Sequence, residues 1–275
     1  MTLSTIRNNP AKQKKVKTKK QKAIAATCAV AFWLLVWYVV SLCVGSELVL
    51  VSPVKVVQTL FTVIFDPDFL KTVWYSAARI LGGFFTALTL GTVLGWVASR
   101  FWVVETLLRP ITAVIKATPV ASFIILVLLW FSGKNLSVII SMLMVFPVIY
   151  MNVLEGIRSA DEKLLEMAQV FRLSVGKKLL YIYLPAVAPF FVSACSVSLG
   201  LCWKSGIAAE VIGTPDGSIG AVFYQAKIFL QTSELLAWTV VVVAVSVAFE
   251  KFFMFLLRLV LKKLKMEDVL NGKRA

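Results

Sequence analysis

Apolar runs of about 20 residues recur from one end of the chain to the other, and they constrain the fold more than any other feature. A helix of that length crosses roughly 30 Å of hydrocarbon with its backbone amides and carbonyls paired internally. The mean hydropathy of +0.86 and the 59% share of hydrophobic residues agree. We therefore expect an all-α polytopic membrane protein with about six transmembrane helices, at residues 23–45, 77–99, 110–132, 136–156, 186–206 and 235–261.

Lysine and arginine are concentrated on one side of these predicted helices. On that side, eight lie in residues 1–22, two are Arg100 and Arg109, five lie in 157–185 and six follow from Arg258 onward. The other side holds five, namely Lys55, Lys71, Lys134, Lys204 and Lys227. Because basic residues are retained in the cytoplasm, both termini are predicted to be cytoplasmic. The net charge of +15 thus reflects topology, and nucleic-acid binding is not expected.

Three segments follow from this pattern. Residues 1–22 form a basic cytoplasmic arm without an acidic residue, residues 23–262 form the transmembrane domain, and residues 263–275 form a cytoplasmic tail. The long basic arm and the lack of an obvious cleavage site indicate that the first apolar run is a retained helix. An uncleaved signal anchor would have the same pattern.

Small residues and prolines predict how the helices pack. Gly83, Ala87, Gly91 and Gly95 recur at four-residue spacing, which lets a neighbouring backbone approach closely. Pro119 and Pro147 are expected to interrupt the third and fourth helices, either as packed kinks or as hinges.

The residues needed for catalysis are missing from the sequence. It contains no histidine, no Cys, Asp or Glu cluster with metal-ligand spacing, and no GxxxxGK[ST] phosphate loop. Cys28, Cys43, Cys195 and Cys202 all lie in or beside apolar runs and are expected to be small packing residues. We predict a non-enzymatic chain that binds no cofactor or metal, so that any ATP and Mg²⁺ would be bound by a partner.

The loop after the fourth helix is predicted to be structured. Ser159 followed by Glu162 fits a capping box that would start a helix at Ala160. Ser174 to Gly176 would end that helix, Lys177 to Tyr183 would form another turn or two, and Pro185 suits the first turn of the next helix. The apolar side chains of this loop need a partner; a loop lying on anionic lipid is the alternative.

This loop resembles the cytoplasmic signature of the permeases of binding-protein-dependent ABC importers, E-A-A, three residues, G, nine residues, I-x-L-P. The chain has Glu166-Met167-Ala168, then Arg172, then Ile182-Tyr183-Leu184-Pro185 at the same spacing, with Met167 and Arg172 as departures. The resemblance implies a type I importer fold and a coupling-helix segment, 159–185, that docks on a separate ATPase. The implied ATPase contacts are Glu166, Met167, Ala168, Phe171, Arg172, Gly176, Ile182, Leu184 and Pro185.

Further stretches resemble the nitrate, sulfonate and taurine branch of that family, namely Arg79 to Phe84, Thr118 to Phe131, and Trp203-Lys204 with Ala209-Glu210. The segment from Lys204 to Glu234 is predicted to be broken at Gly206, Gly213, Pro215, Gly217 and Gly220. The resemblance implies that this segment gates a pathway. Lys204 and Glu210 are costly in lipid, so they should face protein or water, with Lys204 meeting an anion or pairing with Glu210. Possible pathway residues are Ser196, Ser198, Trp203, Lys204 and Glu210.

The predicted function is that of a permease subunit in a bacterial-type inner or cell membrane. The resemblance implies a homodimer, an ATPase dimer, and an external solute-binding protein or lipoprotein. The cargo would be a small anion such as nitrate, a sulfonate or taurine, or a vitamin precursor related to thiamine or riboflavin. An ATP-independent channel or secondary carrier, and a membrane-anchored scaffold, are the alternatives.

Overall fold

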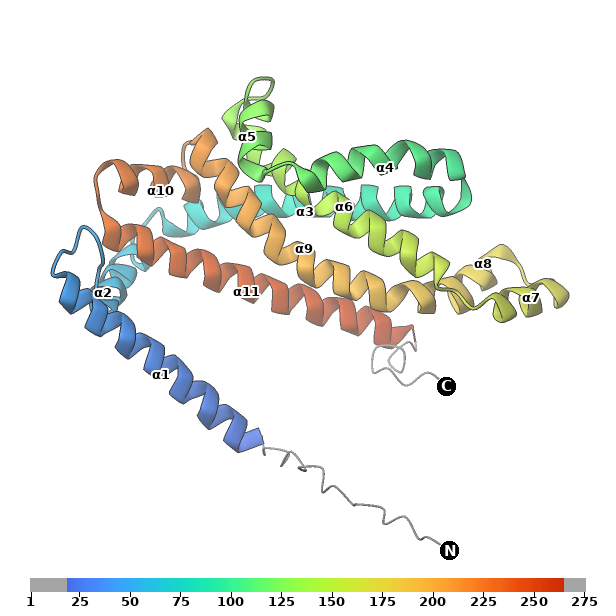
Figure 1. The fold of residues 1–275 in the computed structure, drawn as a ribbon, viewed down its shortest axis with the longest axis horizontal. Coiled ribbons are helices and arrows are strands. Elements are labelled where there is room, and N and C mark those ends of the chain that lie inside the picture. The colour runs from blue at the N-terminus through green and yellow to red at the C-terminus, as the bar shows by residue number, and fades with distance from the viewer. Residues whose placement is uncertain (1–18, 265–275) are drawn as a thin grey trace, which may run out of the picture. The chain divides into compact units, whose positions relative to one another are not determined.

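The computed structural model describes residues 19–264, and these residues form helices and no strand (Figure 1). The elements are α1 (Lys19–Val44), α2 (Pro53–Ile64), α3 (Phe69–Arg100), α4 (Trp102–Ala117), α5 (Val120–Leu128), α6 (Gly133–Arg158), α7 (Glu162–Val170), α8 (Val175–Lys178), the π-helix η1 (Leu179–Tyr183), α9 (Leu184–Gly213), α10 (Ile219–Ile228) and α11 (Thr232–Lys263). The predicted basic arm, 1–22, and the predicted tail, 263–275, lie mostly outside the described residues.

The chain divides into two compact units, with the boundary after Lys55. In the first unit, the Trp37 indole Nε1 donates a hydrogen bond to the carbonyl of Val51, 3.1 Å away, which ties α1 to the segment that follows it. Helix α2 begins in the first unit and continues into the second, which holds α3 to α11.

Five helices within residues 19–264 are long and apolar enough to cross a membrane, and a sixth span arises if α4 and α5 count as one broken crossing. The structure thus confirms an all-α polytopic fold. The third predicted helix, 110–132, is wrong as a single element, because α4 begins earlier, at Trp102, and meets α5 at an angle of 106°. Thr118 is extended, with ψ 132°, as the ring of the following Pro119 requires.

Helices α3, α6 and α9 form the core of the second unit, and the predicted small-residue stripe of α3 faces α6. A Cβ added at Gly91 would lie 3.0 Å from Ile149, and one added at Gly95 would lie 3.0 Å from Val153. Only glycine lets the two backbones approach this closely. Helix α6 does not end at Pro147 but continues through this buried residue.

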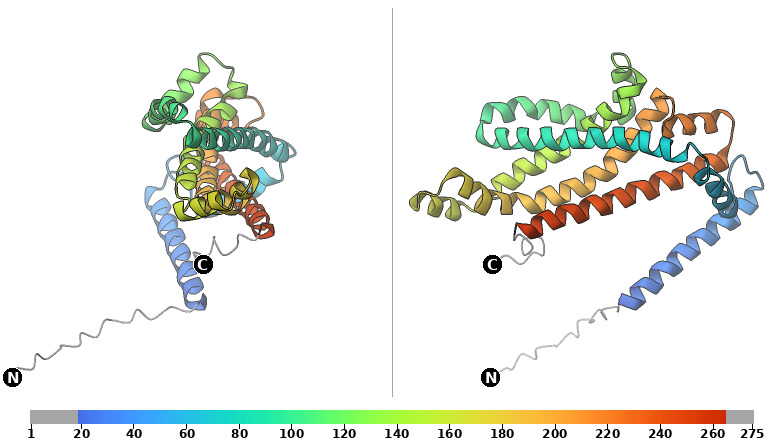
Figure 2. Two further views of the ribbon diagram at one scale, coloured as in Figure 1. Left: turned by 90° about the vertical axis from the view of Figure 1, so that its right-hand side faces the viewer. Right: turned by 180° about the vertical axis from the view of Figure 1, so that it is seen from behind.

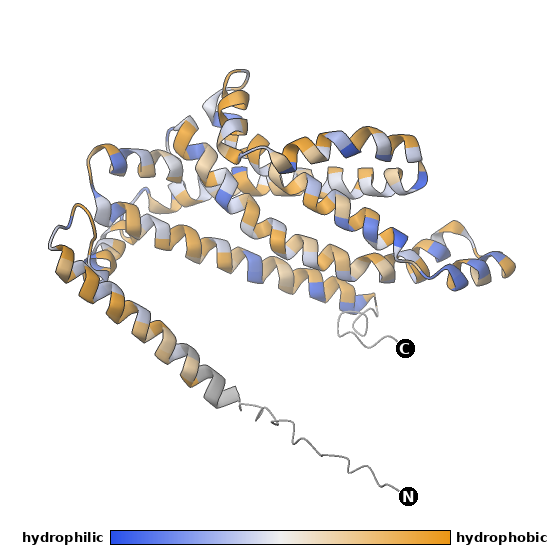
Figure 3. Cartoon of the chain, in the orientation of Figure 1, coloured by the Kyte–Doolittle hydropathy of each residue, from blue (hydrophilic) through white to orange (hydrophobic). Residues whose placement is uncertain are grey.

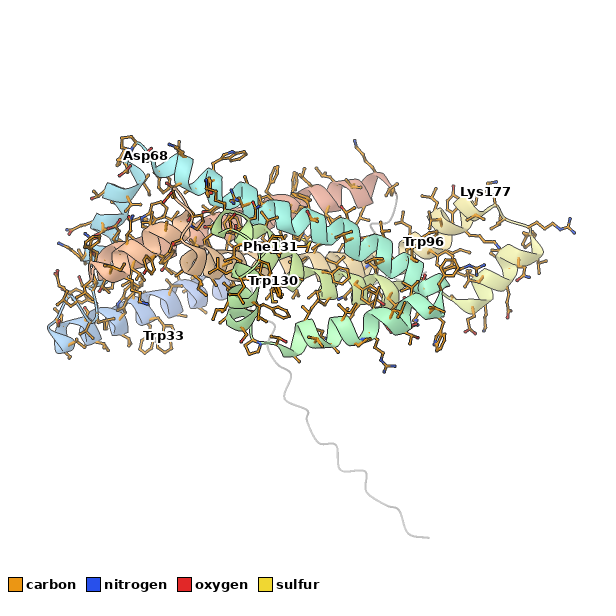
Figure 4. All side chains as sticks on the ribbon, turned by 90° about the horizontal axis from the view of Figure 1, so that it is seen from above. Trp33, Asp68, Trp96, Trp130, Phe131 and Lys177 are labelled. Carbon is orange, nitrogen blue, oxygen red and sulfur yellow. The ribbon has the colours of Figure 1, made fainter. Side chains whose placement is uncertain are left out.

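The two ends of the second unit carry different short helices. Helices α7 and α8 lie beyond one end of the long helices, while α10 packs on α9 and α11 at the other end (Figures 1 and 2). Hydrophobic residues dominate the long helices, whereas α7 mixes hydrophilic and hydrophobic residues (Figure 3). Lys177 of α8 and Asp68, which precedes α3, mark the opposite ends (Figure 4).

Candidate functional site

The first candidate site is the loop from Ser159 to Pro185, and its helix α7 starts two residues later than expected. Asp161 is the N-cap, and its carboxylate accepts a hydrogen bond of 2.9 Å from the Lys163 amide. The Ser159 hydroxyl instead donates to the carbonyl of Gly156. The predicted capping box is therefore wrong, because Ser159 still belongs to the last turn of α6 and a carboxylate nearer to α7 takes the capping position.

After α7 ends at Val170, the chain turns at Arg172, which has the left-handed backbone conformation that favours glycine. Arg172 has φ +49°, its amide donates to the carbonyl of Gln169, and the Leu173 amide donates to the carbonyl of Ala168. This pair of bonds is a Schellman motif, for which glycine is the usual residue at the left-handed position. Arg172 thus preserves the turn that the spacing predicts, although a non-glycine residue is strained there.

The chain enters the membrane helix α9 through a π-helical turn. In that turn the Leu184 amide bonds the carbonyl of Leu179, five residues back. Pro185 follows in the first turn of α9, as predicted, and a wider turn before it relieves the clash of its ring with the preceding carbonyls. The break in the loop covers residues 171–174, so the prediction that Ser174 to Gly176 ends the helix is wrong in position, and Gly176 is exposed within α8.

Two residues of the signature hold the loop together from inside. Ala168 and Ile182 are buried against each other in a small core that also contains Ala160. Leu184 and Pro185 are half-buried, and Leu184 packs near Leu261 of α11. These positions set the shape of the loop and offer little surface to a partner.

Other residues of the loop are open. Met167, Val170, Phe171 and Val175 are exposed, and Phe171 keeps 71% of its surface accessible. Glu166 and Arg172 are exposed beside them. An apolar patch with a charged rim is typical of a protein interface.

The second candidate site is the carboxylate of Glu210, which lies near the C-terminal end of α9 and is fully buried. Its Oε2 accepts a hydrogen bond of 2.6 Å from the Ser76 hydroxyl of α3 and one of 3.4 Å from the Gly220 amide of α10. The Ser76 hydroxyl also accepts from the Ile219 amide at 2.9 Å. Three helices therefore meet at one carboxylate.

Lys204 lies two turns before Glu210 on α9 but is exposed. Within residues 19–264 the one recorded salt bridge joins other residues, so the predicted alternative of a Lys204–Glu210 pair is wrong. Helix α9 also runs through Gly206, where the sequence predicted a break, because an added Cβ there would clash with Ile80 and Ser141 and glycine serves close packing instead.

Comparison with known proteins decides the family. The family model described as binding-protein-dependent transport system inner membrane component matches residues 87–266, which include the whole of the loop from Ser159 to Pro185. The chain belongs to this family of ABC importer permeases.

The permease is similar to transporters of one branch. It is 30% identical over 230 residues to the putative aliphatic sulfonates transport permease protein SsuC of Bacillus subtilis, covering 82% of this chain and 83% of the relative. It is 27% identical to the taurine transport system permease protein TauC of Escherichia coli, covering 78% and 80%. The nitrate import permease protein NrtB of Synechocystis is 26% identical, covering 87% and 90%. These matches place the permease in the nitrate, sulfonate and taurine branch.

Within the permease, the candidate pathway residues have different surroundings. The Ser196 hydroxyl donates 2.9 Å to Glu250 of α11, and Ser198 and Trp203 are buried between helices. With Glu210 buried too, only Lys204 lies on an open face of α9.

Sequence reasoning missed one contact at the base of the loop. Arg158, the last residue of α6, donates a 2.5 Å hydrogen bond to Glu105 of α4 and forms an ion pair with it. The two residues are 53 positions apart, and neither belongs to a motif, so no spacing signal indicates the pair. The pair joins the end of α6, directly before the loop from Ser159 to Pro185, to α4.

Proposed function

We propose that the permease imports a small anion with energy from a separate ATPase dimer that docks on the loop from Ser159 to Pro185. The observation that carries this proposal is the loop itself. Its signature residues Ala168 and Ile182 form its core, Arg172 adopts a left-handed conformation that favours glycine, and Met167 and Phe171 are exposed. An exposed phenylalanine is a strong candidate for the anchor of an interface.

The cargo class is supported by the relatives, whose names state aliphatic sulfonates, taurine and nitrate. All three are small molecules with a negatively charged oxyanion group. An external solute-binding protein would deliver the anion. Transport of a vitamin precursor in place of an anion would contradict this cargo class. ATP and Mg²⁺ would be held by the ATPase, with both termini of the permease in the cytoplasm.

The pathway is proposed to run along the open face of α9 and to be completed by a second copy of the chain. Ser193, Val197, Gly200 and Lys204 recur on this face at helical spacing, and all are at least partly accessible. A hollow of about 210 Å³ at the same face is lined by Asn152, Pro189, Phe190 and Ser193. Since a charged side chain is costly in lipid, Lys204 would face water or the second copy.

Docking is tested by co-purification of the tagged permease with an ABC ATPase from the same genome that is co-expressed with it. The substitution Phe171→Asp should abolish retention of the ATPase, and Glu166→Arg should weaken it. Phe229→Asp is a matched control, because Phe229 is 70% exposed and also ends a helix, α10, before a left-handed residue, but at the opposite end of the bundle. Equal ATPase retention by Phe171→Asp and Phe229→Asp would refute the docking site.

An ATP-independent carrier is the competing function, and two carboxylates inside the helices are the observation in its favour. Glu210 and Glu250 both accept serine hydroxyls within membrane helices, and such residues are common in proton-coupled carriers. Uptake into liposomes that lack ATP would support that function instead.

A further inference from the structure

Helix α10 is capped by two side chains that come from other helices. The first amides of any helix lack partners within it. In α10 the Ile219 amide donates to the hydroxyl of Ser76 from α3, and the Gly220 amide donates to the carboxylate of Glu210 from α9. The next amide, that of Ala221, is held locally by the hydroxyl of Ser218.

The backbone of α10 is seated tightly at the same point. A Cβ added at Gly220 would clash with the Cβ and backbone of Glu210. The connection from α9 is short and passes through Thr214, a β-branched residue at φ +40°, which such residues rarely adopt. The N-terminus of α10 can therefore stay where it is only while α3 and α9 keep their present alignment.

Stability alone does not explain this carboxylate. Glu210 is fully buried, its Oε2 is held by Ser76 and the Gly220 amide, and the Ser137 hydroxyl lies within reach of the same carboxylate. Burying an ionisable group is costly even when it is hydrogen-bonded, and ionisable residues within membrane helices commonly mark function.

Helix α9 connects this carboxylate to the coupling loop. The helix runs without interruption from Leu184, directly after the π-helical turn of the loop, to Gly213. The distance along it from Leu184 to Glu210 is about 40 Å, at 1.5 Å per residue. A displacement of α9 at the loop would therefore also displace Glu210 relative to Ser76 on α3.

From these contacts we infer that Glu210 and Ser76 form a latch that positions α10, and that sliding of α9 against α3 opens or closes it. Glu210 is then a positioning residue, since it acts through α10 and not on the cargo. The transport role of the latch rests on the proposed function, in which α9 receives its movement from the docked ATPase. The latch itself is a property of the permease alone.

The latch is tested by residue-resolved hydrogen exchange of the full-length permease. Glu210→Met keeps the approximate volume but removes both acceptor oxygens, and Ser76→Ala removes the bridging hydroxyl. Each should make the Ile219 and Gly220 amides exchange at least about tenfold faster, because a buried amide that loses its partner is left unsatisfied, a cost of about that size. The Ala221 amide should keep its rate. Glu210→Gln retains an acceptor oxygen and should stay within about threefold of the unmodified permease.

Glu250→Met is the control that shows whether the loss of any carboxylate within the membrane helices has the same effect. Glu250 also accepts a hydrogen bond from a serine of α9, Ser196, but it is remote from α10 in sequence. The variant should leave exchange at Ile219 and Gly220 unchanged. Unchanged exchange in both Glu210→Met and Ser76→Ala, or equal acceleration in Glu250→Met, would overturn the latch.

The transport role is read separately, as stimulation of ATP hydrolysis by the cargo-loaded binding protein. Glu210→Met should retain the ATPase on co-purification and lose this stimulation, and Glu210→Gln should recover it. The transport role would be overturned if Glu210→Met showed full stimulation of ATP hydrolysis while its Ile219 and Gly220 amides exchanged faster. If the unmodified permease retains no ATPase, the proposed function fails, while the exchange experiment still decides the latch.

Discussion

The left-handed arginine at the end of α7 gives a prediction whose magnitude follows from the backbone. Arg172 occupies a conformation that costs a non-glycine residue roughly 1–2 kcal/mol. Glycine avoids this cost but loses roughly 0.5–1 kcal/mol more conformational entropy on folding. Arg172→Gly should therefore stabilise the turn by about 1 kcal/mol, which corresponds to about fivefold slower local opening.

The side chain and the backbone at this position can be separated by a second substitution. Arg172→Ala removes the same charge and side chain as Arg172→Gly but keeps the strained backbone. Hydrogen exchange of the Leu173 amide, which bonds the carbonyl of Ala168, reports the opening of the turn. The amide should exchange about fivefold more slowly in the glycine variant than in the alanine variant.

Leu230 provides an independent check, because it completes a Schellman motif at the end of α10. It has φ +55°, and the following Gln231 amide bonds the carbonyl of Ala226. Leu230→Gly should slow exchange of the Gln231 amide relative to Leu230→Ala by a similar factor. If the Leu173 and Gln231 amides exchange as fast in the glycine variants as in the alanine variants, the strain argument is incorrect.

Two further predictions concern packing and charge. Gly83→Ala should destabilise the permease by about 1–3 kcal/mol, because the added Cβ would lie 2.8 Å from Ser141. In the matched Gly82→Ala variant the added Cβ meets nothing within 4 Å, and the melting temperature should rise, since glycine costs up to about 1 kcal/mol in a helix. Equal melting temperatures of the two variants would contradict this. Glu105→Arg and Arg158→Glu should each reduce cargo-stimulated ATP hydrolysis, and the double exchange should restore it. Because this pair is partly exposed (Arg158 50%, Glu105 25%), the expected coupling is only about 0.2–1 kcal/mol, and a double variant no better than the singles would argue against it.

The sequence was sufficient to predict the class of fold and a structured loop after the fourth predicted helix, because both depend on local patterns. Apolar length identifies membrane helices, and four-residue spacing correctly predicted the close approach of α3 to α6 at Gly91 and Gly95. The loop signature likewise depends on spacing, which Arg172 preserves through its backbone conformation.

The errors occurred where the outcome depends on tertiary contacts. Pro119 ends a helix and Pro147 does not, although both are prolines in apolar runs. Glycine at position 206 was interpreted as a helix breaker, but α9 continues through it because its missing side chain admits Ile80. The partners of Glu210 are 134 and 10 residues away in sequence, and no periodicity indicates which of them it contacts.

The most direct test of the central claim is uptake into liposomes that contain the permease with its ATPase, given the external binding protein loaded with taurine, a sulfonate or nitrate. We predict that the cargo accumulates only when ATP is enclosed on the side of the α7 loop, and that Phe171→Asp abolishes accumulation. Accumulation without ATP, or undiminished accumulation in Phe171→Asp, would contradict import driven through this loop.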